Sequence, residues 1–156
     1  MTDDALVGAA ETTIDQCLNL QPGESCVVVT DDKRRPIGEA LYETASERTE
    51  DAVILQYRPL DQHGMEPPAP VAAAMREADV FVAPTTKSLT HTLARSNATD
   101  AGARGATMPG ITEEVMIRGL DADYDAIAEG CASLLEQVEA ATEIRVTSPQ
   151  GTDITF

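Results

Sequence analysis

The segment CVVVT, from Cys26 to Thr30, is a short β-branched run between polar stretches, which is typical of a buried strand. Pro22-Gly23 before it ends a helical pattern that spans about Asp3 to Leu20. After it, Asp31-Asp32 can cap a helix in whose first turn Pro36 is tolerated. The chain therefore alternates helix, strand and helix around this segment, which is the pattern from which parallel sheets are built.

The same alternation continues along the chain. Three further segments are predicted strands: AVILQY (52–57), DVFVAP (79–84) and ARGATM (103–108). Apolar residues recur at helical spacing between them, and the strongest helical pattern begins at Asp121. We therefore predict an α/β fold, with an open, mainly parallel sheet of about five strands flanked by helices in three layers, Rossmann-like or flavodoxin-like. The strand orders 2-1-3-4-5 and 3-2-1-4-5 both fit these segments.

The last two strand-like segments are EIRVTSP (Glu143–Pro149) and TDITF (Thr152–Phe156). In one interpretation they form an antiparallel hairpin across Pro149-Gln150-Gly151, at an edge of the sheet. In the other, TDITF leads into further chain. We predict an α/β domain over residues 1–149 and take residues 150–156 as the start of a linker or strand.

The chain is strongly acidic. Its 156 residues suit one domain, and 27 Asp and Glu against 11 Lys and Arg give a formal net charge of −16. Such a surface excludes nucleic acid and anionic membranes as partners, because both require basic patches. Lys33 and Lys87 are the only lysines. This composition favours a salt-adapted (halophilic) protein over a merely acidic one. The sequence shows neither a signal peptide nor a membrane span, which predicts a soluble, cytoplasmic protein.

The three cysteines, Cys17, Cys26 and Cys131, are widely spaced and form no Cys-x-x-Cys motif. They are interpreted as small core residues in a reducing compartment. Cys17 and Cys131 both fall on the apolar faces of predicted helices, so we expect both to be buried.

The stretch PTTKSLTHTLAR (Pro84–Arg95) is the strongest candidate site. It follows the third predicted strand, and ligands of open α/β sheets bind at the carboxyl ends of strands. If a helix begins by Lys87, then Lys87, His91 and Arg95 share one face of it. The hydroxyls and the helix N-terminus would add donors for a carboxylate or phosphate. The candidate ligand or cleft residues in this stretch are Thr85, Thr86, Lys87, Ser88, His91 and Arg95. The alternative is a surface stripe of cations that pair with the surrounding acids.

Two other groups of residues have a functional and a simpler interpretation. Asp31-Asp32 could hold Mg²⁺ with a third carboxylate, but a helix cap with surface charge is the simpler reading. His63, with Asp61 and Glu66 nearby, could ligate a metal, but a solvated loop fits the irregular spacing better. We therefore predict no metal ligand and no catalytic residue in this chain.

The block PTTKSLTHTLARSNATDAGARGATMPGITEEVMIRGL (Pro84–Leu120) resembles the N-terminal region of the aminopeptidase T type of metallo-aminopeptidases, often called leucyl aminopeptidases. The resemblance rests on TKSLTHT followed by AR, on the GAR segment and on MPGIT. The final VTSPQGTDITF is similar to the segment before that family's second domain, and PGESCVVVTDD and HGMEPPAPVAAAM match it in style. The resemblance covers nearly the whole chain.

This resemblance implies a metal-dependent hydrolase that removes N-terminal amino acids from peptides. The family's metal-binding residues lie in a C-terminal domain, to which residues 150–156 would lead, so this chain alone would be inactive and bind no cofactor. A divalent metal (Zn, Co or Mn), a peptide substrate and a homodimer are expected of the complete enzyme. Lys87, His91 and Arg95 would face the cleft or a neighbouring domain, and Asp153 would make an interdomain contact. The alternative is a stand-alone α/β binding or scaffold domain for an anionic small ligand.

Overall fold

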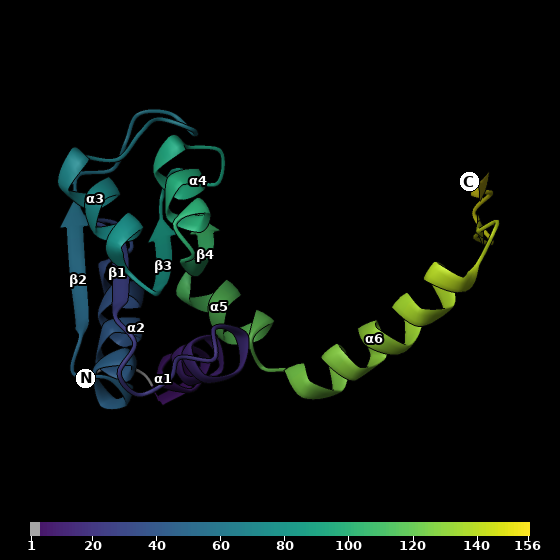
Figure 1. Cartoon of the computed structure of the whole chain (residues 1–156), viewed down its shortest axis with the longest axis horizontal. Helices are drawn as coiled ribbons and strands as arrows, with labels where there is room; N and C mark the ends of the chain where they lie inside the picture. The colour runs from purple at the N-terminus through teal and green to yellow at the C-terminus, as the bar shows by residue number, and fades with distance from the viewer. Residues whose placement is uncertain (1–3) are drawn as a thin grey trace. The chain divides into compact units, whose positions relative to one another are not determined.

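The computed structural model describes residues 4–156, which form two compact units, one ending at Ala122 and the other spanning Asp123–Phe156. The first unit alternates helices and strands along the chain (Figure 1). Its helices are α1 (Asp4–Glu11), the π-helix η1 (Thr12–Cys17), α2 (Arg35–Arg48), α3 (Ala69–Glu77), α4 (Leu93–Asp100) and α5 (Glu113–Gly119). Its strands are β1 (Cys26–Asp31), β2 (Ala52–Tyr57), β3 (Val80–Thr85) and β4 (Arg104–Pro109).

The four strands form one parallel sheet in the order β2-β1-β3-β4. This order agrees with the predicted order 2-1-3-4-5. The chain adds β2 on one side of β1 and then crosses to the other side of β1 to add β3 and β4. The α/β class and the parallel sheet are thus confirmed. The sheet holds four strands rather than about five, because the predicted strand at Glu143–Pro149 lies in the second unit.

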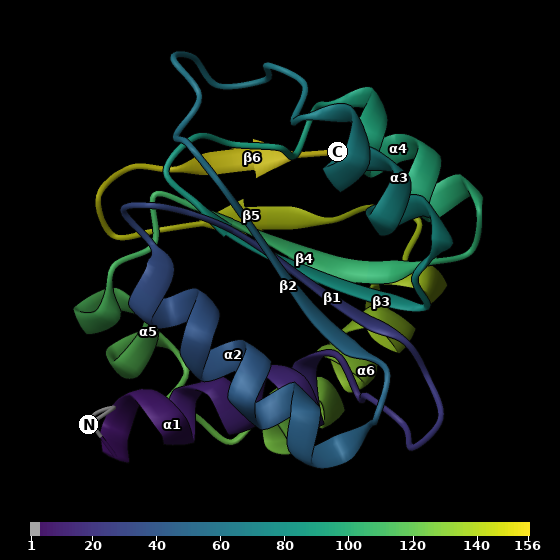
Figure 2. The same cartoon turned by 90° about the vertical axis from the view of Figure 1, so that its left-hand side faces the viewer.

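Helices cover both faces of the sheet, giving three layers (Figure 2). On one face α1, α2 and α5 pack on side chains such as Cys26, Val28 and Val80. On the other face α3 and α4 pack on Val27, Val29 and Phe81. Successive residues of β1 therefore enter opposite cores, which explains why CVVVT is apolar without alternation.

The prediction that Cys17 is buried is wrong, and the reason lies in η1. In this π-helix Leu18 N donates to Thr13 O at 2.9 Å, five residues back. The wider turn breaks the ordinary helical spacing, so Ile14 and Leu18 face the core while Cys17 is exposed. Cys26, in the middle of the sheet, is buried as expected.

The second unit consists of helix α6 (Tyr124–Ala140) and the strands β5 (Arg145–Thr147) and β6 (Asp153–Thr155). The strands pair antiparallel, with Val146 opposite Ile154, which confirms the hairpin interpretation but places it outside the main sheet. Cys131 is exposed, contrary to expectation, because no second layer covers the apolar side of α6 within residues 123–156. None of the helices in residues 4–156 is long and apolar enough to cross a membrane.

Candidate functional site at the carboxyl edge of the sheet

The sheet opens between β1 and β3 at its carboxyl edge. The pairing of β1 with β3 ends at Val28 opposite Val82. The outer pairings continue further, to Asp31 opposite Tyr57 and to Thr85 opposite Pro109. Beyond the last paired residues, side chains connect the two central strands. This opening is the topological switch point, where open α/β sheets place their ligands.

Asp31 is the main connection across the opening. Its side chain is buried, with the residue only 1 % exposed, and one carboxylate oxygen accepts from the Thr86 hydroxyl at 2.9 Å and from Lys33 N at 3.0 Å. The other oxygen accepts from the backbone N–H of Thr86. Three donors thus compensate the buried charge. Burial, with the Asp31 charge in addition, raises the pKa of Tyr57 to about 12.

The Asp31 contacts correct the predicted helix cap. The N-cap position of α2 is occupied by Arg34, without a side-chain cap, and Pro36 lies in the first turn as expected. Asp31 binds the loop after β3 instead, because Thr86 offers two donors just beyond the end of the neighbouring strand. A second bond supports this contact, since the Thr30 hydroxyl donates to Pro84 O at 3.2 Å.

The shared helical face of Lys87, His91 and Arg95 does not form. Helix α4 begins only at Leu93, so Lys87 and His91 lie in the preceding loop. Side chains hold this loop in a non-helical path: the Thr85 hydroxyl donates to Lys87 O at 2.7 Å, and His63 Nδ1 accepts from Ser88 N at 3.1 Å. The helix is capped by Thr92, which accepts from Arg95 N at 3.2 Å, and not by Ser88 or Thr86.

The N-terminus of α4 is already occupied by a carboxylate. Glu66 accepts from Leu93 N at 2.6 Å and from Ala94 N at 3.0 Å. The free N–H groups that were expected to attract an anionic ligand are therefore satisfied by the protein. No local pattern identifies this contact, because Glu66 lies 27 residues before Leu93 in the chain.

The two remaining predicted residues, Arg95 and Asp153, lie in different units. Arg95 is half-buried, and its Nε donates to Thr90 O at 2.9 Å. Asp153 lies in the second unit, where it pairs with Arg145 at 2.7 Å, and this bond lowers the pKa of the Asp153 carboxyl. Within the described residues, no group of three His, Cys, Asp or Glu side chains is arranged to hold a metal.

Four of the segments that carry the family resemblance meet at this edge, whereas GAR (102–104) lies at the start of β4 and VTSPQGTDITF (146–156) lies in the second unit. Asp31, from PGESCVVVTDD, binds Thr86, and His63, from HGMEPPAPVAAAM, accepts from Ser88 N. The segment MPGIT joins through Gly110, whose N–H donates to Thr85 O at 2.7 Å. The sequence alone does not show that these segments lie side by side.

No protein-family profile matches the chain, and no curated protein matches it. Among solved structures, wild-type AmpT from Thermus thermophilus, an aminopeptidase, is similar with a TM-score of 0.45 and 18 % identity. The similarity covers 75 % of this chain and 41 % of AmpT, so the chain matches less than half of that protein's length. The comparison amounts to a weak structural similarity to an aminopeptidase.

Proposed function

We propose that this chain is the α/β domain of an aminopeptidase-like hydrolase of the leucyl aminopeptidase type, and that the carboxyl edge of its sheet faces the peptide substrate or a neighbouring domain. One observation carries the proposal: four of the segments that resemble the family converge on this edge, although they are spread from residue 22 to residue 112. Convergence of distant segments at a switch point is typical of a site rather than of a core requirement.

The described residues do not fit a catalytic metal centre. The Asp31 oxygens already accept three hydrogen bonds, and His63 Nδ1 already accepts one from Ser88. In our proposal the divalent metal (Zn, Co or Mn) of the complete enzyme is bound by other residues, and a homodimer forms the functional unit. The part of this domain is then to position the peptide, since orientation is itself a large contribution to catalysis.

Two measurements test this proposal. The 156-residue chain is incubated with leucine p-nitroanilide and Co²⁺, Zn²⁺ or Mn²⁺, and we expect no release of p-nitroaniline. Clear turnover that is lost on chelation would contradict the assignment of the metal ligands to other residues.

The second measurement is an NMR titration of the same chain with a leucine-containing tripeptide. We expect saturable shifts at the amides of Thr86, Ser88 and Gly110, and none at the opposite edge. A tripeptide that leaves these amides unchanged at millimolar concentration would contradict the role of this edge in substrate positioning.

A further inference from the structure

Some of the cations of this chain pair with a carboxylate and others do not. Six of the 11 Lys and Arg side chains lie within 4.0 Å of a carboxylate: Arg35, Arg48, Arg76, Arg104, Arg118 and Arg145. The other five, 11 minus six, have no carboxylate partner among residues 4–156: Lys33, Arg34, Arg58, Lys87 and Arg95. With 27 acidic residues in the chain, five cations without a carboxylate partner need a reason.

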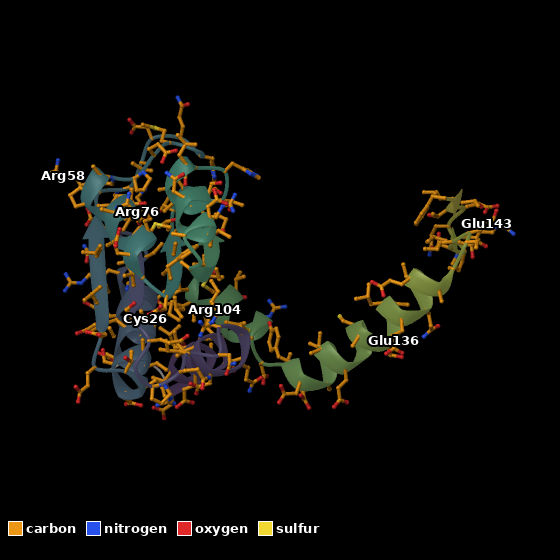
Figure 3. All side chains as sticks on the ribbon, viewed as in Figure 1. Cys26, Arg58, Arg76, Arg104, Glu136 and Glu143 are labelled. Atoms are coloured by element: carbon orange, nitrogen blue, oxygen red, sulfur yellow. The ribbon has the colours of Figure 1, made fainter. Side chains whose placement is uncertain are left out.

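All five unpaired cations follow the carboxyl end of a central or neighbouring strand. Lys33 and Arg34 lie in the turn after β1, Arg58 directly follows β2, and Lys87 lies two residues after β3, with Arg95 in the first turn of α4. Figure 3 shows Arg58 at this end of β2, whereas the paired Arg104 lies at the start of β4. The cations without a carboxylate partner are therefore concentrated at the carboxyl edge of the sheet.

Arg34 is the unpaired cation with the most unusual surroundings. Its Nε is buried and has no hydrogen-bond partner among the described residues. Among the described residues, the Arg34 side chain makes one hydrogen bond, a long one from Nη2 to Gly110 O at 3.4 Å. A buried N–H donor without an acceptor is unfavourable. The forked N–H groups of a guanidinium readily donate two hydrogen bonds to one anion.

The nearby carboxylates do not supply that acceptor. Asp31 already accepts three hydrogen bonds, from Thr86 and Lys33 N, and Asp32 accepts from Gln56 at 2.7 Å. Helix α2, which begins beside Arg34, has no side-chain cap either, whereas α4 is capped by Thr92 and its first N–H groups donate to Glu66. The turn after β1 thus presents a guanidinium that pairs with no carboxylate of the described residues, although the backbone N–H groups of the turn are bonded.

We propose that the carboxyl edge of the sheet, beside the turn after β1, binds a small phosphate-bearing molecule, with Arg34 as the central contact and Lys33 and Lys87 as further cationic groups. A phosphate dianion suits this set better than a single carboxylate, because its three terminal oxygens accept from several donors at once. The net charge of −16 repels a phosphate polymer, so the ligand is a small molecule. This site does not depend on the proposed hydrolase function.

The test is an NMR and calorimetric titration of the 156-residue chain with inorganic phosphate and pyrophosphate, at constant ionic strength. We expect saturable binding, pyrophosphate tighter than phosphate, with the largest amide shifts at Lys33, Arg34 and Lys87. Arg34→Gln lowers the affinity at least about tenfold and Lys87→Gln less, because Arg34 makes the charge-assisted bidentate contact. Arg34→Lys keeps the charge but removes Nε, and it lowers the affinity to an intermediate value.

Arg76→Gln is the matched control, because Arg76 is exposed, pairs with the adjacent Glu77 and lies in the last turn of α3. Circular dichroism verifies that each variant is folded. Linear, non-saturating shifts, or equal affinities for Arg34→Gln and the unchanged chain, overturn the proposal. Equal binding of succinate overturns the phosphate assignment. A failure of the peptide titration above leaves this result unaffected, so the two proposals fail separately.

Discussion

Asp31, the last residue of β1, holds Thr86, the first residue after β3, through both the backbone N–H and the hydroxyl of the threonine. The contact joins residues 55 positions apart and lies just beyond the point where β1 and β3 stop pairing. It therefore fixes the geometry of the opening at the switch point. The buried carboxylate has a structural role there, which is why it is available neither as a helix cap nor as a metal ligand.

Removing this contact should destabilise the first unit. Asp31→Ala leaves the two Thr86 donors and Lys33 N without their acceptor, and we expect a loss of about 1–3 kcal/mol in the free energy of unfolding. Urea denaturation followed by circular dichroism measures this loss. Asp32→Ala is the control, since Asp32 is exposed, and a change within about 0.5 kcal/mol is expected. Equal effects of the two substitutions would contradict the structural role of Asp31.

A second prediction concerns pH and the contact between Arg104 and Glu24. Arg104 donates to Glu24 from two nitrogens and from Nε to Leu18 O at 2.7 Å, which joins β4 to the segment before β1. Hydrogen bonding from Arg104 lowers the pKa of Glu24 from 4.5 to about 2. Because the folded pKa is depressed, the stabilisation is complete above about pH 4.5 and is lost as the pH falls towards about 2.

Glu24→Gln should therefore unfold more easily than the unchanged chain at pH 7, by about 1–3 kcal/mol. The difference should shrink as the pH falls from 4.5 to about 2, because the unchanged chain then loses the same charge. Urea denaturation at pH 7, 4 and 2.5 checks this convergence. A difference that stays constant over that range would show that the Glu24 charge has no part in folding.

Two helical glycines should respond in opposite ways to alanine. A Cβ on Gly38 in α2 would lie 2.7 Å from the Thr30 side chain in β1, so Gly38→Ala forces helix and strand apart. We expect a loss of about 1–3 kcal/mol in the free energy of unfolding. Gly8 in α1 has open space around it, and Gly8→Ala should stabilise by about 0.5–1 kcal/mol through helix propensity. Thermal or urea denaturation of both variants provides the comparison.

The proposed salt adaptation leads to a further prediction. Repulsion among 27 acidic residues opposes the compact state at low ionic strength, and salt screens it. The midpoint of thermal unfolding should rise steadily between 0.1 M and 2 M KCl. A control series with sucrose at matched water activity separates charge screening from general preferential exclusion. A midpoint that does not change with KCl would contradict salt adaptation.

Much of the fold follows from local patterns. The runs at Cys26–Thr30, Ala52–Tyr57 and Asp79–Pro84 predicted three strands within one residue of their observed ends, because β-branched apolar runs bounded by turns have few alternatives. The hairpin across Pro149-Gln150-Gly151 is equally local, and Gly151 takes the positive φ of 103° that this turn requires. Cys17 was mispredicted because a π-helical turn breaks the spacing on which the prediction depends.

The sequence by itself determined the elements, the α/β class and the concentration of unusual residues after β3. Only the tertiary structure decided the strand order, the opening between β1 and β3 and the partners of Asp31, Glu66 and Arg34. The physical reason is range. Strand and helix preferences act within a few residues, whereas the contacts of the site join residues 25 to 76 positions apart, and only the folded sheet brings these together.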